Sequence, residues 1–147
     1  MVVTKQMAIV SNYSSIIKAS LIGSTVAGIL LGIFMQMMGM IGMIASMFGS
    51  ESLVIGWIMH MMISWIFGLG YGAMTLISSR YYLVGIIHGV LIWVIGPLMV
   101  MPMMMGMGSM IGAMFEGPQL MSLFTHLGFS LILAGVFSFL INKSIKE

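Results

Sequence analysis

The sequence contains no cysteine and no aspartate, and few residues carry any charge. Without cysteine, the chain has no disulfide framework, no thiolate nucleophile and no cysteine-ligated zinc site. The acidic residues are Glu51, Glu116 and Glu147, and all of them lie outside the apolar runs. The sequence therefore offers no pair of carboxylates inside a membrane and none of the acid–base chemistry that such a pair performs.

Other functional signatures are missing as well. There is no glycine-rich phosphate loop, no serine-nucleophile elbow and no His-Glu-x-x-His motif. Five basic residues spread along the chain form no basic patch, so we expect no nucleic-acid partner. With a single arginine and no acid inside the apolar runs, a voltage sensor or a carboxylate-driven carrier is not indicated either. We expect no enzymatic activity.

The chain does contain a large excess of apolar residues. Of 147 residues, 61% are hydrophobic and 5% are charged, and the mean hydropathy is +1.19. A soluble core could not bury that much apolar surface, so the lipid bilayer must solvate most of it. We predict one integral membrane domain over residues 1–147, an all-α bundle of four transmembrane helices with short connections, with spans at about 18–38, 53–77, 83–101 and 119–141.

The segments between the spans are short and mostly apolar. Residues 1–17 predict a short interfacial helix that is retained before the first span, because the segment does not resemble a cleaved signal peptide. Residues 39–52 predict a short helix on the membrane surface. Pro97 and Pro102 should kink or end the third span, because each lacks a backbone donor.

The few charges predict an orientation. Four spans place both termini and the turn between spans two and three on one side, and Glu51 and Glu116 on the other. The positive-inside rule then places both termini in the cytoplasm, in a cytoplasmic (inner) membrane. Every basic residue lies on that side: Lys5, Lys18, Arg80, Lys143 and Lys146.

Small residues recur at every fourth position in the spans, which is typical of close helix contacts. In the central stripe of the second span, we expect His60 and Ser64 to meet the fourth span. Gly68 and Gly72 should meet another helix, at a right-handed crossing of roughly −40°. The predicted packing residues of the whole chain are Gly28, Gly32, Gly56, Ser64, Gly68, Gly72, Gly85, Gly89, Ser122 and Ser130.

Three histidines fall within the spans, where an ionisable side chain is a functional candidate. At 1.5 Å per residue, His60 and His126 lie roughly 10 Å below the outer surface and could meet, whereas His88 lies roughly 8 Å from the inner surface. One interpretation is structural: each imidazole hydrogen-bonds a neighbouring helix and holds the bundle together. The other is functional: His60 and His126 converge on a metal, a haem or a proton path.

Methionine is unusually abundant, with 21 residues, and many lie near the outer connections. Thioethers are soft ligands that suit Cu(I), and imidazole binds copper in either oxidation state. Methionine is also an adaptable residue for packing and docking, and that is the competing interpretation. The candidate metal ligands are His60, His126, Met103, Met104 and Met107.

Several motifs together resemble the YagU-type bacterial inner-membrane proteins over residues 53–141. The resemblance implies a multispan inner-membrane protein with intramembrane histidine and no assigned reaction. It favours His60, Ser64, Tyr71, Pro102 and His126 as site residues. The motifs are His60-x-x-x-Ser64, Phe67-Gly68-x-Gly70-Tyr71-Gly72, Gly85-x-x-x-Gly89 leading to Trp93, Met101-Pro102-x-x-x-Gly106 and Ser122-x-x-x-His126.

Three hypotheses for function follow. The first is a small non-catalytic subunit or assembly partner of a larger prokaryotic membrane complex, such as a respiratory or copper-dependent oxidase, with no resident cofactor. The second is a copper- or haem-binding or transport protein that uses His60, His126 and outer methionines. The third is a proton or small-solute pathway gated by imidazole protonation. The expected partners are the lipid bilayer and other membrane subunits or further copies of the chain.

Overall fold

The computed structural model describes residues 2–144, and it describes side chains from Tyr13 onward. The described chain is all-helical and contains no strand. Its elements are α1 (Val2–Met37), α2 (Met40–Met47), α3 (Leu53–Thr75), α4 (Tyr81–Ile95), the π-helical turn η1 (Gly96–Val100), α5 (Met101–Met104), the 3₁₀ turn η2 (Ile111–Ala113) and α6 (Gly117–Ser144).

Four helical segments are long and apolar enough to cross a membrane. Each has the roughly 20 residues that ~30 Å of hydrocarbon requires. The chain therefore has the build of a multi-pass membrane protein, and the segments lie close to the predicted spans. They are Tyr13–Met37, Leu53–Thr75, Tyr81–Met104 and Gly117–Ser144.

The first helix differs from its prediction. Residues 1–17 were expected to form a separate interfacial helix, but α1 runs without a break from Val2 to Met37. The physical reason is local, because no glycine or proline precedes Gly23 and nothing interrupts the helix. The connection after it forms the expected short helix, α2, whose apolar face is buried through Ile41 and Ile44.

The third span continues past Pro97. The helix widens there into the π-helical turn η1, which has Pro97 in its first positions. A π turn pairs each N–H with the carbonyl five residues back, so the residue after a proline can reach the carbonyl that the proline leaves without a donor. The predicted disruption at Pro97 is therefore a local widening, and the helix runs on to Met104.

Pro102 shapes the outer end of this span. Because it has no N–H, it leaves the carbonyl of Leu98 open, and Met110 N–H donates to that carbonyl at 2.7 Å. The helix ends at Met104, and Gly106, with a φ of +75°, forms the left-handed cap that follows. The cap is completed by a 2.9 Å hydrogen bond from Met107 N–H to the Pro102 carbonyl. Backbone hydrogen bonds thus hold this methionine-rich connection in place.

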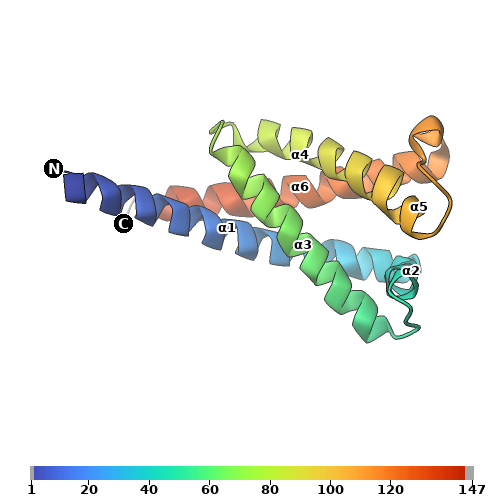
Figure 1. Ribbon diagram of the computed structural model, residues 1–147. Coiled ribbons are helices and arrows are strands. Elements are labelled where there is room, and N and C mark those ends of the chain that lie inside the picture. The colour runs from blue at the N-terminus through green and yellow to red at the C-terminus, as the bar shows by residue number, and fades with distance from the viewer. Residues whose placement is uncertain (1, 145–147) are drawn as a thin grey trace.

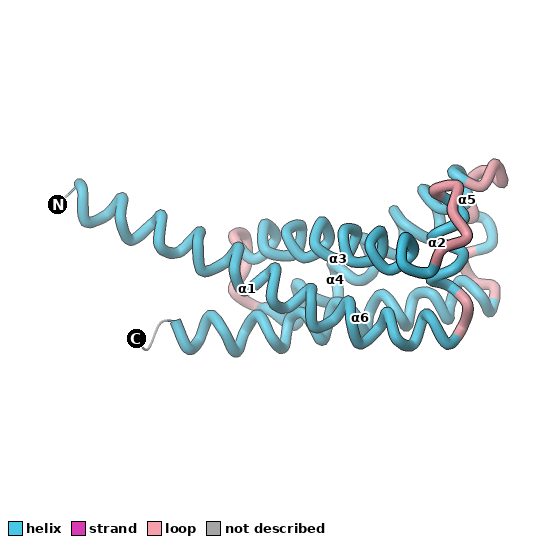
Figure 2. Tube along the Cα trace, turned by 90° about the horizontal axis from the view of Figure 1, so that it is seen from below, coloured by secondary structure: helices cyan, strands magenta, loops and turns pink. Residues whose placement is uncertain are grey.

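The helices form a bundle in which α6 packs against both α1 and α4, and α1 also packs against α3. Contacts between α3 and α4 are sparser, and α3 crosses the other helices obliquely (Figure 1). Both ends of the chain lie at one end of the bundle, and α2 and α5 lie at the opposite end (Figure 2). We call these the terminal end and the connection end.

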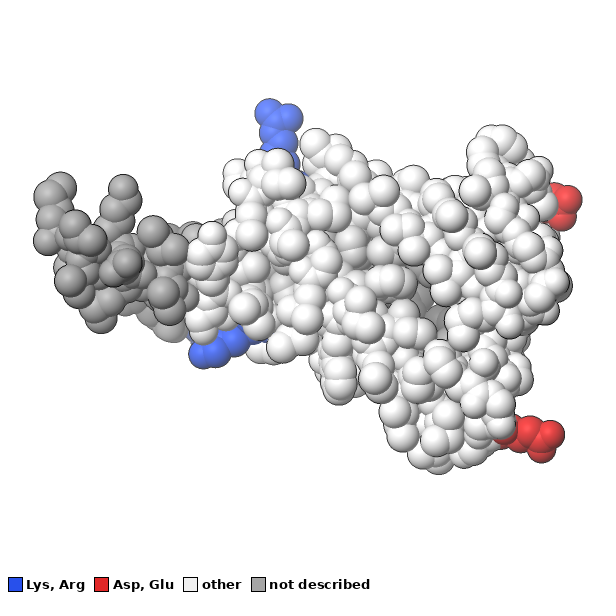
Figure 3. Space-filling model, viewed as in Figure 1, with Lys and Arg blue, Asp and Glu red and all other residues white. Residues whose placement is uncertain are grey.

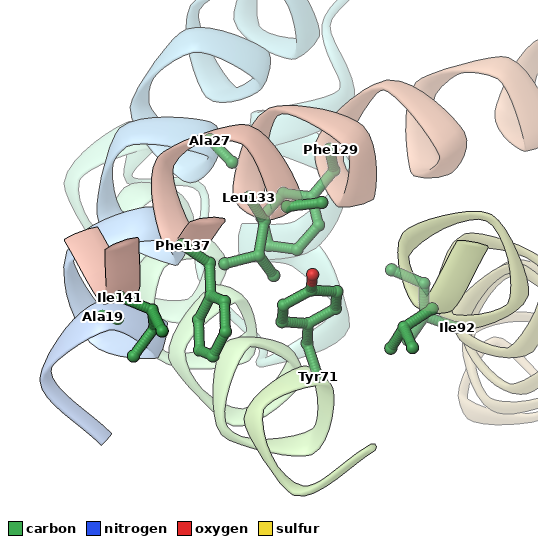
Figure 4. Close-up of a cluster of buried hydrophobic side chains, with 10 residues drawn as sticks. Ala19, Ala27, Tyr71, Ile92, Phe129, Leu133, Phe137 and Ile141 are labelled. Carbon is green, nitrogen blue, oxygen red and sulfur yellow. The ribbon is translucent and has the colours of Figure 1, made fainter. Parts of the chain in front are cut away.

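A cluster of buried side chains, half of them from α6 and the rest from α1, α3 and α4, forms the core of the bundle (Figure 4). Tyr71 of α3 is fully buried, and its ring meets Phe137 of α6 edge-on at 5.3 Å. Its hydroxyl donates to the Tyr81 carbonyl at 2.9 Å, and the Tyr81 ring packs on the other side of Phe137 at 5.3 Å. Tyr71 therefore ties α3, α4 and α6 together.

The charged side chains are separated along the bundle. Figure 3 shows the described Lys and Arg side chains toward the terminal end and the acidic side chains at the connection end. The acidic residues there are Glu51 and Glu116, which are exposed. Lys146 and Glu147 lie outside the described residues, and the side chain of Lys5 is not described.

Candidate functional site

The small-residue stripes of α1 and α3 face each other along their length. An added Cβ at Gly68 would lie 2.4 Å from the Ser24 side chain, and one at Gly28 would lie 2.9 Å from the Ser64 hydroxyl. Such distances leave room for hydrogen only, so glycine is needed for this approach. The contacts keep an antiparallel register in steps of four residues: Ser20 with Gly72, Ser24 with Gly68, Gly28 with Ser64 and Gly32 with His60.

This register corrects one prediction. The outer part of the α3 stripe, around His60 and Ser64, was expected to meet the fourth span, but it meets α1. Gly56 at the start of the stripe approaches α2, where its Cβ would lie 2.3 Å from the Ile41 carbonyl oxygen. The reason is that α1 carries a matching stripe at the same four-residue spacing, and a close contact needs small residues on both helices.

The α6 stripe faces α4 instead. An added Cβ at Gly85 would lie 3.1 Å from Ala134 and from the Ser130 carbonyl, and one at Gly89 would lie 3.0 Å from Leu127. Ser130 is fully buried in this contact, whereas Ser122 is half-buried one turn before His126. The α1 stripe therefore packs on α3, whereas the α4 glycines pack on α6.

His60 is buried and bridges α3 to α1. Its Nε2 lies 2.9 Å from the Gly28 carbonyl oxygen, and since a carbonyl only accepts, Nε2 carries the proton and donates. The neutral ring is then left with Nδ1 as an acceptor, and no described group donates to it. The Trp57 ring packs edge-on against the imidazole at 5.8 Å, and the Trp57 indole donates to Gln36 of α1.

His88 is buried and has both nitrogens engaged. Its Nε2 donates to the Phe67 carbonyl of α3 at 3.0 Å, so Nδ1 accepts from the Ser130 hydroxyl of α6 at 2.8 Å. The Tyr71 ring meets the imidazole edge-on at 5.6 Å. His88 therefore connects three helices, and its two hydrogen bonds leave no ring nitrogen for a ligand.

His126 is half-buried, and its hydrogen bond stays within its own helix. Nδ1 donates to the Ser122 carbonyl at 2.7 Å, which leaves Nε2 as the acceptor nitrogen. No described group donates to Nε2. No hydrogen bond joins two imidazoles among the described residues.

The methionine candidates lie apart from the histidines. Met103 and Met104 end α5, and Met107 follows the glycine cap, so all three sit exposed at the connection end. His60 lies seven residues inside α3, which is about 10 Å of helix. Within residues 2–144, no group of three or more His, Cys, Asp or Glu side chains could hold a metal ion.

Two residues matter more than the sequence suggested. His88 was placed in a separate inner layer, and its hydrogen bonds agree with the structural interpretation, because they connect α3, α4 and α6. Its flanking glycines, Gly85 and Gly89, were the available signal, because they place it in a close contact with α6. Ser20 was one small residue in a stripe, and its hydroxyl is buried without a hydrogen-bond partner in the described structure.

The chain was compared with protein-family models, with curated proteins and with solved structures, and none of the three comparisons finds a match. The resemblance to the YagU-type proteins therefore stays a prediction. Functional inference for this chain depends on the geometry described above.

Proposed function

We propose that this protein is a non-catalytic subunit or assembly partner of a larger membrane complex, and that it docks through its connection end. The observation that carries the proposal is the exposed apolar surface formed there by the two connections. Met37 is 82% exposed, Phe115 77% and Met103 59%. Met37 and Met103 lie in the last turns of candidate spans, and Phe115 lies in the connection just before α6.

Such a surface favours a protein partner for two reasons. Contiguous exposed apolar patches mark sites of interaction, and methionine adapts its shape to the surface that it meets. The backbone of this surface is fixed by hydrogen bonds, because the N–H groups of Met110 and Met107 donate to carbonyls of the preceding helix. The small-residue stripes offer less support for docking than the sequence suggested, since α1, α3, α4 and α6 use them on one another.

The same proposal includes the orientation. Lys18 of α1, Arg80 before α4 and Lys143 of α6 belong to the terminal end, and Glu51 and Glu116 belong to the two connections, so the positive-inside rule favours cytoplasmic termini. The docking surface then faces the outer side of a cytoplasmic membrane. A reporter fused to the C-terminus should be active only in the cytoplasm, and activity on the outer side would overturn the orientation.

Native co-purification in a mild detergent tests the docking proposal. We expect the chain to migrate with another integral membrane protein, and the triple variant Met103→Ala, Met104→Ala and Met107→Ala to lose it. The matched control is Ile86→Ala, Ile87→Ala and Leu91→Ala, which removes as many exposed apolar side chains from the lipid-facing side of α4. A chain that migrates alone, or a triple variant that keeps its partner, contradicts the proposal.

A second candidate function is copper binding between His60 and His126. The observation in its favour is that both rings commit their N–H to a backbone carbonyl and keep one acceptor nitrogen open, Nδ1 in His60 and Nε2 in His126. Neutral nitrogens without a nearby carboxylate suit a soft monovalent ion such as Cu(I) better than a hard divalent ion. The exposed methionines would act at most as an entry point.

Metal analysis and the absorption spectrum of the purified protein, taken with and without added Cu(I), test this candidate. We expect about one copper ion per chain, lost in His60→Ala and in His126→Ala but kept in the triple methionine variant. The spectrum would reveal haem if haem were the occupant. Wild-type protein that binds neither copper nor haem excludes this candidate.

A further inference from the structure

The end of α1 and the second connection present exposed thioethers at the connection end of the bundle (Figure 2). The exposed fractions of these side chains run from 39% to 82%. Met105 and Met107 lie beyond the last residue of the candidate span Tyr81–Met104. We call the set the connection methionines, and its members are Met37, Met38, Met103, Met104, Met105 and Met107.

The backbone of the second connection keeps some thioethers exposed and others covered. Gly106 and Gly108 have φ angles of +75° and +72°, a conformation that glycine adopts readily. Met107 lies between them, and its N–H donates to the Pro102 carbonyl while its side chain is 58% exposed. Met110 lies three residues further along, and it is only half-buried, with its N–H bonded to the Leu98 carbonyl. One short connection thus offers an exposed thioether and a more covered one for comparison.

An exposed thioether is available to a small oxidant, and no thiol competes for it because the sequence contains no cysteine. The sulfur lone pair attacks one oxygen of hydrogen peroxide, so an S–O bond forms as the O–O bond breaks. The proton on the transferred oxygen passes to the leaving hydroxide, which departs as water. The sulfur is oxidised by two electrons and the peroxide is reduced by two, so the step needs no other reactant.

We propose that the connection methionines are a site of sulfoxidation by peroxide, and that their oxidation releases the partner bound at the connection end. The release rests on the proposed docking function, whereas the modification site does not. A sulfoxide turns an apolar side chain into a polar one that accepts hydrogen bonds. Each sulfoxide buried in the docked interface without a donor weakens binding about tenfold. Methionine sulfoxide reductases restore the thioether, and the docking surface with it.

Mass spectrometry of the full chain in membranes, after treatment with hydrogen peroxide, tests the modification site. We expect Met107 to gain one oxygen several-fold faster than the half-buried Met110. Met62 is the matched control, because it is 46% exposed but lies near the middle of α3 in a candidate span. Charge separates as the S–O bond forms, and hydrocarbon disfavours charge, so Met62 should also react slowly.

Equal rates of oxidation at Met107 and Met62, or at Met107 and Met110, overturn the modification site. This measurement needs no partner, so it decides the site even where the docking proposal fails.

Native co-purification from treated and untreated membranes tests the release. We expect peroxide to lower the amount of retained partner about tenfold or more. A variant in which leucine replaces every connection methionine keeps the apolar volume without a thioether, so it should retain the partner after treatment. The control variant Met62→Leu and Met74→Leu, which changes two methionines of α3, should lose the partner as the wild type does. Methionine sulfoxide reductases added to the oxidised wild type should restore binding, a test that needs no variant.

Three outcomes overturn the release. The first is an equal loss of partner from the leucine variant and from the wild type, which would place the sensitive group elsewhere. The second is a wild type that keeps its partner although Met107 is fully oxidised. The third is an oxidised wild type that the reductases convert back to thioethers without regaining its partner. An untreated wild type that migrates alone contradicts the docking proposal itself, and the release fails with it.

Discussion

His88 and His126 are one residue type in one membrane-spanning bundle, and their surroundings differ. His88 has both ring nitrogens hydrogen-bonded, to Phe67 of α3 and Ser130 of α6, and it is buried against Tyr71. His126 bonds the carbonyl of Ser122 in its own helix and keeps its other nitrogen open, as His60 does after donating to α1.

The difference comes from what each partner helix offers. An imidazole has one donor and one acceptor, so a helix carbonyl can satisfy half of it, and a hydroxyl on a third helix is needed for the rest. Ser130 supplies that hydroxyl to His88. His88 in the terminal half therefore has both ring nitrogens hydrogen-bonded, whereas His60 and His126 in the connection half each keep one nitrogen as an acceptor.

The largest effect is expected for Gly68→Leu, which tests how closely α1 and α3 pack in the terminal half. The new side chain would meet the Ser24 side chain and the Ser20 carbonyl, the latter at 2.9 Å from Cβ, and backbone cannot move aside easily. We expect a loss of about 3 kcal/mol or more in the free energy of unfolding. Titration with SDS, followed by circular dichroism, measures it. Gly70→Leu, two residues along on the open side of α3, should be nearly neutral, and equal losses would contradict the packing described here.

Replacing each histidine sharpens the comparison directly. His88→Ala removes two hydrogen bonds, leaves the buried Ser130 hydroxyl without its acceptor and leaves a void beside Tyr71, so we expect a loss of about 2–3 kcal/mol in the free energy of unfolding. His126→Ala removes one bond within α6 and should lose less than about 1 kcal/mol. If His126→Ala proved the more damaging in the same SDS titration, the assignment of the structural role to His88 would be wrong.

A milder test of the terminal half is Tyr71→Phe. The ring stays against Phe137 and His88, and only the bond from the hydroxyl to the Tyr81 carbonyl is lost. We expect a loss of about 1 kcal/mol in the free energy of unfolding. Tyr82→Phe is the control, because that ring is exposed, and it should leave the unfolding curve unchanged. If the unfolding curve of Tyr71→Phe coincides with that of the wild type, the hydrogen bond from the Tyr71 hydroxyl does not contribute to stability.

The smallest effect on stability, about 0.5 kcal/mol, is expected for Pro102→Ala at the connection end. The new N–H would compete with Met110 for the Leu98 carbonyl and free the connection that follows. Hydrogen exchange at the Met110 amide should become several-fold faster, while exchange in α6 stays unchanged. An unaltered Met110 rate would show that the connection does not depend on the carbonyl that Pro102 leaves open.

Much of this fold was predictable from local patterns. The runs of apolar residues predicted four spans, and the helices Leu53–Thr75 and Gly117–Ser144 agree with them to within three residues at each end. The short helix between spans one and two was predictable from its apolar composition, and it is α2. The sequence did not predict that α1 continues through its N-terminal segment. The polar residues there suggested a boundary, but nothing in the segment interrupts the helical backbone.

The candidate site was less predictable, because its members come from different helices. Spacing by four marked His60 and Gly28 as members of stripes, and it could not say that these stripes meet each other. The depth argument placed His60 and His126 in one layer, but it could not say that His60 bonds the backbone of α1 whereas His126 bonds its own helix. The methionines were grouped with them by composition, although Met103 and Met107 lie at the surface.

The sequence by itself determined that this chain forms helices that can cross a bilayer, and which residues are small enough to let them touch. Both follow from properties that act along a single helix, namely hydropathy, length and the 3.6-residue turn. Tertiary structure alone decided which stripe meets which, that Ser130 completes the hydrogen bonding of His88, and that the Ser20 hydroxyl is buried without a partner in the described structure. These outcomes depend on how two surfaces fit, and neither helix contains that information alone.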